Sequence, residues 1–165
     1  MSVLQPFLDL EVLALLSAAN GAPVITKYLL SNRFPQPLDR GRRFIDGRPL
    51  FGASKTIRGL ISSIASTCVV AIMLALPWST GLAVAIVAML GDLFSSFLKR
   101  RMGLASGDMA LGLDQIPESL MPSLICINLV GLTIIDVLVI VAVFCIGELL
   151  LSRLLFDLRI RDRPY

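Results

Sequence analysis

The stretch around Asp92 combines groups that can bind a metal ion with groups that can bind phosphate. Asp92, Ser95, Ser96 and Lys99 follow one another at i, i+3, i+4 and i+7, which places them on one face of a helix. Asp92 lies about 10 Å along the axis from Lys99, well inside an apolar segment. A carboxylate at such a position normally faces a wet cavity and has a partner. The alternative interpretation is a structural ion pair with a basic residue of another helix.

A second acidic pair begins the next apolar segment. Asp114 and Glu118 flank Pro117, a residue that suits the first turn of a helix. In a helical first turn the two acids share a face at i, i+4. Together with Asp92 they supply three carboxylates, and the chain contains no His, so Mg²⁺ is favoured over zinc. An N-cap role for Asp114 is the alternative.

The segment from residue 37 to residue 59 is rich in Gly, Arg and Lys. Lys55, Thr56 and Arg58 lie where an apolar segment begins, and a helix N-terminus offers free N–H groups to a phosphate. Carboxylates surrounded by Lys and Arg are what a metal–triphosphate complex needs. The alternative is a basic loop that fixes membrane topology and contacts anionic lipid headgroups.

The apolar segments that must position these groups approach the length needed to cross a membrane. The chain has 165 residues, is 56% hydrophobic and 16% charged, and has a mean hydropathy of +0.82. A membrane-crossing helix needs about 20 predominantly apolar residues. We therefore predict an all-α integral membrane bundle of five transmembrane helices, the first interrupted at residues 20–23. The predicted helices span about residues 6–30, 57–76, 80–98, 115–131 and 133–155.

The distribution of basic residues predicts the orientation of this bundle. All 15 Lys and Arg residues lie in or beside the 30–56 connection, the 99–114 connection and the C-terminal tail. Five spans place these three segments on one side, and basic loops stay in the cytoplasm. We predict a multi-pass protein of the cytoplasmic membrane, with polar loops, active site and C-terminus on the cytoplasmic side and the N-terminus outside.

The motifs together resemble those of a known family of membrane nucleotidyltransferases. The stretch Gly91-Asp92…Ser95…Lys99-Arg100-Arg101, followed by Leu113-Asp114-Gln115-Ile116, resembles the C-terminal motif of phosphatidate cytidylyltransferases (CDP-diacylglycerol synthases). The similarity is closer to the short members, the CDP-archaeol synthases. These share Asn20…Pro23, Pro37-Leu38-Asp39-x-Gly41, Asp46-Gly47-Arg48 and Gly52-x-x-Lys55-Thr56-x-Arg58-Gly59. Residues 1–165 are thus expected to form a single membrane-embedded cytidylyltransferase-like domain.

The resemblance implies an Mg²⁺-dependent transfer of a cytidylyl group from CTP to a membrane lipid phosphate, giving a CDP-lipid and pyrophosphate. It implies that Asp92 and Asp114 hold the metal and form the catalytic set with Lys55 and Lys99. The substrate- and nucleotide-binding residues it implies are Asn20, Asp46, Lys55, Thr56, Arg58, Ser95, Lys99 and Arg100. The expected partners are CTP, the lipid phosphate and membrane lipids, and no nucleic acid. The identity of the acceptor lipid and the oligomeric state, a homo-oligomer included, stay open.

Two positions depart from the family pattern. The superfamily usually has a second Asp three residues after the Asp114 position, where this chain has Pro117, so Glu118 becomes the third candidate metal ligand. Archaeal members carry His and Asn near the end of the last span, where this chain has Glu148 and Ser152. The competing hypotheses are a non-catalytic ion or anion carrier and a structural subunit with an inherited, inactive site.

Overall fold

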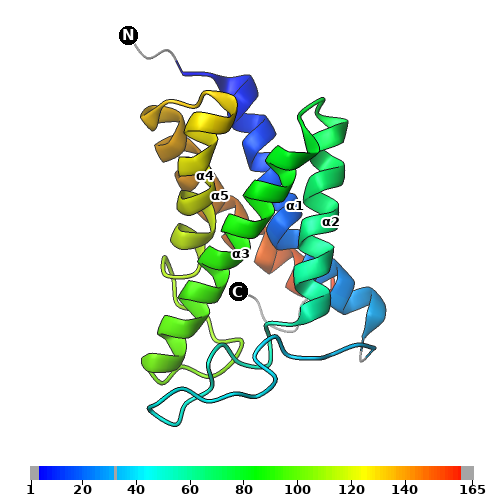
Figure 1. Cartoon of the computed structure of the whole chain (residues 1–165), viewed down its shortest axis with the longest axis vertical. Coiled ribbons are helices and arrows are strands. Elements are labelled where there is room, and N and C mark those ends of the chain that lie inside the picture. The colour runs from blue at the N-terminus through cyan, green and yellow to red at the C-terminus, as the bar shows by residue number, and fades with distance from the viewer. Residues whose placement is uncertain (1–3, 32, 161–165) are drawn as a thin grey trace.

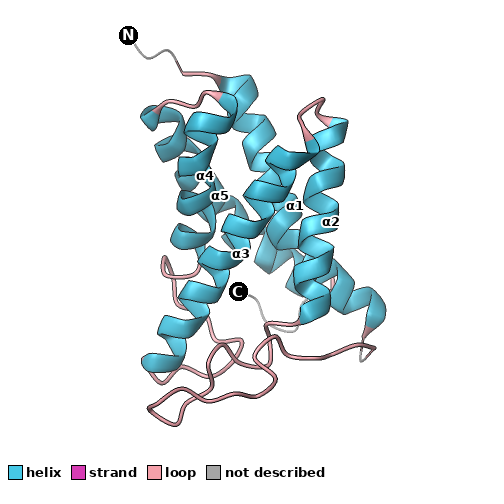
Figure 2. Cartoon of the chain, in the orientation of Figure 1, coloured by secondary structure: helices cyan, strands magenta, loops and turns pink. Residues whose placement is uncertain are grey.

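The structure is a computed structural model that describes residues 4–31 and 33–160. These residues form five α-helices and no β-strand, which confirms the predicted all-α fold. The long connections gather at one end of the bundle and the short ones at the other (Figures 1 and 2). The helices are α1 (Pro6–Leu30), α2 (Ile57–Met73), α3 (Trp78–Arg101), α4 (Gln115–Val130) and α5 (Ile134–Asp157).

The helix boundaries lie close to the predicted ones, with two differences that matter. The expected interruption of the first helix is wrong, since α1 continues through residues 20–23 with Pro23 inside it. Pro23 packs closely against Gly59 of α2. A Cβ added to Gly59 would lie 3.4 Å from the Pro23 Cβ. The third helix extends beyond residue 98 to Arg101, so Lys99 and Arg100 lie in its last turn.

Helix length and surface composition indicate a membrane protein. Among the described residues, α1, α3 and α5 are long and apolar enough to cross a membrane, and α2 is a shorter apolar helix. Large apolar side chains point outward, among them Phe7, Met73 and Leu150. A water-soluble protein rarely exposes so large a continuous apolar surface.

Helix α1 lies at the centre of the bundle and contacts each of the other four helices. Its Val12, Leu15 and Leu16 are fully buried and pack with Val84 of α3 and Ile140 of α5. Helix α5 packs against α1 and α4 but contacts neither α2 nor α3. The bundle is therefore left open between α5 and the α2–α3 pair.

The start of α1 is joined to the α4–α5 connection on the side of the short connections. Asp136 is fully buried and forms a capping box with Thr133 at the start of α5. The backbone N–H of Gln5 donates to Asp136 Oδ1 (3.0 Å), and the Gln5 side chain donates to the Gly131 carbonyl (3.2 Å). The start of α1 is thus fastened to the α4–α5 turn.

Candidate active site

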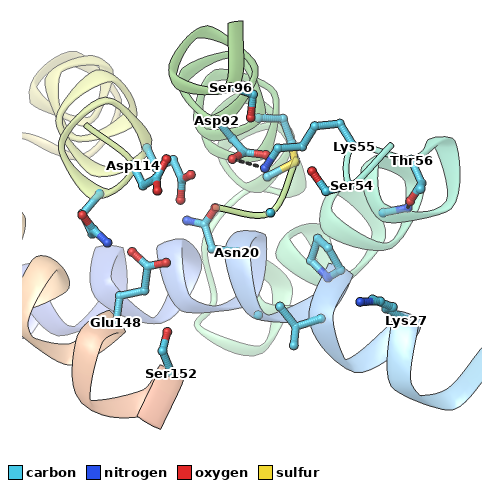
Figure 3. Close-up of a pocket in the computed structure, with 18 of the residues that line it drawn as sticks. Asn20, Lys27, Ser54, Lys55, Thr56, Asp92, Ser96, Asp114, Glu148 and Ser152 are labelled. Atoms are coloured by element: carbon cyan, nitrogen blue, oxygen red, sulfur yellow. Dashed lines mark hydrogen bonds and ion pairs between the residues drawn. The ribbon is translucent and has the colours of Figure 1, made fainter. Parts of the chain in front are cut away.

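A cavity of about 870 Å³ lies at the end of the bundle where the long loops gather, and every helix contributes to its lining (Figure 3). Its lining combines carboxylates and basic side chains with apolar residues such as Leu13, Met89 and Phe144. The predicted site residues that line it are Asn20, Lys55, Thr56, Arg58, Asp92, Lys99, Arg100, Asp114 and Glu118. Residues from all parts of the sequence are therefore gathered at one place.

Two predicted binding residues lie outside the cavity lining. The Asp46 carboxylate lies 3.1 Å from Arg101 Nε and accepts the backbone N–H of Arg48, so it organises the loop. Ser95 is fully buried, and its hydroxyl donates to the backbone carbonyl of Asp92 (2.9 Å). Both side chains have local partners that compete with a substrate role.

Lys55 and Asp92 form the first charged pair of the cavity, with 2.5 Å between Lys55 Nζ and Asp92 Oδ1 (dashed line in Figure 3). Lys55 is positioned because Thr56, the next residue, accepts the Gly59 N–H (3.2 Å) and caps α2. Burial opposes the charge of Lys55, but the carboxylates of Asp92 and Glu118 outweigh it and raise the pKa of Lys55 above its ordinary value. The lysine is therefore held charged beside the acids.

The Asp92 carboxylate also interacts electrostatically with the carboxyl group of Glu118 on α4. Close contact between α3 and α4 makes this possible, because Gly91 has no Cβ. A Cβ there would lie 2.4 Å from the Pro117 carbonyl oxygen, so only glycine fits. Two neighbouring carboxyl groups repel each other when both are ionised, so a proton or another cation is favoured near them.

Lys99 and Asp114 form the second charged pair, with 2.6 Å between Lys99 Nζ and Asp114 Oδ1. Lys99 also donates to the Asp108 carbonyl (2.9 Å), and Asp114 Oδ2 accepts the Ala110 N–H (2.9 Å). Asp114 occupies the N-cap position of α4 without capping the helix with its side chain. Its carboxylate instead holds the 102–114 loop against Lys99.

Asp39 organises the loop between α1 and α2, a role that the sequence analysis did not assign. Its carboxylate accepts the backbone N–H groups of Gly41, Phe51 and Gly52, each at 3.0 Å. Burial opposes ionisation, but these hydrogen bonds hold the pKa of Asp39 below its ordinary value. The short Asp-x-Gly spacing at residues 39–41 was the available signal, because an Asp side chain often binds the backbone two residues on.

Several further polar groups of the cavity were not predicted as site residues. Glu148 and Ser152 of α5 face it across from Asn20, whose side chain points toward its centre (Figure 3). Ser54, Ser96 and Gln115 also contribute to its polar lining. Glu148 and Ser152 stand at the departures from the family pattern, which was the one sequence signal for them.

The donor set of this cavity fits Mg²⁺ held jointly by protein and phosphate. Among the described residues, no three acidic or sulfur ligands come close enough to enclose a metal ion by themselves. Mg²⁺ commonly uses only one or two carboxylates together with substrate phosphates. The basic and acidic residues of the lining are equal in number, so a triphosphate needs further positive charge there. The basic residues are Lys27, Lys55, Arg58, Lys99 and Arg100, and the acidic residues are Asp92, Asp108, Asp114, Glu118 and Glu148.

Comparison with known proteins assigns the chain to a family. The family model described as CarS-like CDP-archaeol synthase matches residues 34–165. The chain belongs to the CDP-archaeol synthase family. That match includes every charged residue of the two lysine–carboxylate pairs.

Curated CDP-archaeol synthases resemble the chain over differing lengths. The protein from Hyperthermus butylicus is 43% identical over 105 residues, which cover 60% of this chain and 60% of that protein. The protein from Sulfurisphaera tokodaii is 35% identical over 135 residues, which cover 78% of this chain and 81% of that protein. The aligned part thus spans about three fifths of the first CDP-archaeol synthase and most of the second.

A solved structure shares the fold of this CDP-archaeol synthase family member. It is described as an intramembrane enzyme for archaeal membrane lipid biosynthesis. The two chains superpose with a TM-score of 0.69 at 28% identity, over 84% of this chain and 90% of the other. The comparison extends the family relation from the sequence motifs to the whole bundle.

Proposed function

We propose that this chain is a CTP-dependent cytidylyltransferase that converts a membrane lipid phosphate to a CDP-lipid and releases pyrophosphate. The observation that carries the proposal is the pairing of Lys55 with Asp92 and of Lys99 with Asp114 in one cavity of a CDP-archaeol synthase family member. The name of the relatives favours an archaeol-type ether-lipid phosphate as acceptor. The whole of residues 1–165 acts as one domain in this proposal.

The reaction joins two anions that repel each other. An oxygen of the lipid phosphate attacks the α-phosphorus of CTP, the bond from that phosphorus to the bridging oxygen breaks, and pyrophosphate leaves with the electron pair. Lys55, Lys99 and Arg100 neutralise phosphate oxygens and hold the reactants in line. Asn20, Thr56 and Arg58 line the same cavity, where they can bind the nucleotide.

Mg²⁺ is the proposed cofactor. Asp92, Glu118 and Asp114 are the residues that would hold it, each from the α3–α4 side of the cavity. When bound, the ion supplies positive charge to the phosphate oxygens and so favours departure of pyrophosphate. The protein's own part is to hold these carboxylates in place through Gly91, Lys55 and Lys99.

The Glu118 carboxyl group is expected to affect the Mg²⁺ requirement directly. Glu118→Gln keeps the shape of the side chain but replaces a carboxylate oxygen, a ligand for Mg²⁺, with an amide nitrogen, so turnover should fall and half-maximal turnover should need several-fold more Mg²⁺. Glu118→Asp should also be impaired, because the shorter side chain falls back from the metal. Steady-state assays over a range of Mg²⁺ concentrations test this. An unchanged Mg²⁺ dependence in both variants would remove Glu118 from the site.

In the proposed topology all five helices cross the cytoplasmic membrane, with the N-terminus outside and the cavity and C-terminus on the cytoplasmic side. Ser54 and Ser106 are exposed on the long loops, and Ser79 is exposed at the other end of the bundle. A cysteine at Ser54 or Ser106 should react with a membrane-impermeant reagent only from the cytoplasmic side, and a cysteine at Ser79 only from outside. These labels are read in a variant that lacks Cys68, Cys126 and Cys145. Labelling of position 79 from the cytoplasm would contradict five spans.

Direct assay of the reaction tests the function itself. Purified protein is incubated with labelled CTP, Mg²⁺ and a panel of ether- and ester-linked lipid phosphates, and CDP-lipid and pyrophosphate are measured. Formation of both products in equal amounts is the expected result. No product with any lipid phosphate would instead support a non-catalytic carrier or an inherited, inactive site.

A further inference from the structure

A second cavity, of about 570 Å³, lies among the loops beside the first. Its charged lining consists of Arg43, Arg48, Arg100 and Asp39. The Asp39 carboxylate is already engaged by three backbone N–H groups, so the arginines dominate the charge offered to a ligand. An arginine-lined cavity of this kind fits a small, highly charged oxyanion, because guanidinium groups bind phosphate oxygens in pairs.

The two cavities meet at a common wall formed by Ala53, Arg100 and Ser106. The 31–56 and 102–114 loops run side by side there (Figure 1), joined by the Ser54 N–H and the Ser106 hydroxyl. Those two atoms lie 3.1 Å apart, and the two serine hydroxyls are also 3.1 Å apart. Gly52 lies close to this wall, because a Cβ added to it would be 2.9 Å from Ser106 Oγ.

Arg100 is the charged residue that lines both cavities, and one nitrogen of its guanidinium group lacks a hydrogen-bond partner among the described residues. Its side chain is only 4% exposed, and its Nε has no hydrogen-bond partner among the described residues. A buried guanidinium nitrogen without a partner is costly, so its position calls for an anionic ligand. Because Arg100 lines both cavities, an anionic ligand could reach it from either one.

We propose that the second cavity receives the pyrophosphate released by the reaction, which leaves past Arg100 toward Arg43 and Arg48. This inference rests on the proposed function. In phosphoryl-type transfer the attacking and leaving oxygens lie roughly in line with the phosphorus. In the proposed topology the lipid phosphate enters from the bilayer, and an in-line leaving group would depart toward the loops that line the second cavity.

Arg43 offers the cleanest test, because it is exposed and, among the described residues, its guanidinium donates to the Gly47 carbonyl of its own loop (3.1 Å). Arg42 is its matched control, since it is also exposed, lies one residue away and does not line the second cavity. In Arg43→Gln the inhibition constant of pyrophosphate should rise about tenfold, the size expected for one lost charge-assisted hydrogen bond. The KM for CTP should change less than twofold, and Arg42→Gln should alter neither constant.

Three outcomes of this comparison would overturn the inference. An unchanged inhibition constant in Arg43→Gln removes the second cavity from the pyrophosphate path. A proportional rise of the KM for CTP assigns Arg43 to the phosphates of bound nucleotide. An equal effect of Arg42→Gln shows a general effect of loop charge.

Equilibrium binding separates this inference from the proposed function. Labelled pyrophosphate is dialysed against the purified full chain in detergent, with inorganic phosphate as competitor and without CTP or lipid. Weaker binding by Arg43→Gln than by wild type and Arg42→Gln supports the cavity even when the wild type makes no CDP-lipid. If all three proteins bind pyrophosphate equally and the wild type makes CDP-lipid, the second cavity is excluded as a pyrophosphate site and the proposed function is retained.

Discussion

The Asp92→Asn variant is expected to lose turnover by about 100-fold or more while it still folds and inserts. Asp92 pairs with Lys55 and interacts electrostatically with Glu118, so the substitution removes a charge from the lining of the cavity. Loss of one partner of a buried ion pair usually destabilises a protein by about 3–5 kcal/mol. Here the neighbouring Glu118 can act as the counter-ion of Lys55 instead, because its carboxyl group lies close enough to influence that lysine.

Turnover and thermal unfolding of Asp92→Asn should therefore be measured on the same detergent-purified sample. Ser62→Ala is a matched control, since Ser62 has its hydroxyl bonded within α2 and does not line the cavity. A folded Asp92→Asn protein with near-normal turnover at saturating Mg²⁺ would show that Asp92 is not a principal ligand. Glu118 would then be the acid to test next.

The Lys99→Met variant is expected to lower kcat/KM for CTP by about 100-fold, the effect of removing one preorganised donor from a buried site. Lys99 is 7% exposed and donates to both Asp114 and the Asp108 carbonyl, so its ammonium group is fixed in place. Arg153→Met removes a charge from an exposed position of α5 outside the cavity and should have little effect.

Comparison of kcat/KM in these two variants distinguishes a phosphate-binding group from a topology signal. Lys99→Arg should recover part of the activity, because it keeps the charge but not the shape of the ammonium group. Equal and small losses in Lys99→Met and Arg153→Met would favour a basic loop that only orients the protein. Retention of the helical circular dichroism spectrum shows that any loss is local.

The helices and most of the cavity could be predicted from sequence because both follow from regular spacing. Apolar runs specify helices whatever their neighbours, and the i, i+7 spacing of Asp92 and Lys99 places both on one face. The Asp114–Glu118 pair followed in the same way, and both side chains do line the cavity. Such local rules hold because helix geometry is repetitive.

Loop positions and contacts between distant helices could not be predicted in this way. Asp46 forms an ion pair with Arg101, which lies more than 50 residues away in the sequence, and no local pattern indicates that pairing. The continuity of α1 through Pro23 depends on packing against Gly59 of another helix. Glu148 was left without a role because its place in the cavity depends on how α5 packs on α1.

The fastening of Gln5 to the α4–α5 turn has a consequence for the biogenesis of the protein. The ribosome makes Gln5 well before Asp136, so their hydrogen bond cannot form until the start of α5 has emerged. The cavity draws its walls from both α1 and α5 and is therefore incomplete during synthesis. Nascent chains that have yet to insert α5 hold the lysines and carboxylates up to α4, but not the finished compartment for two substrates.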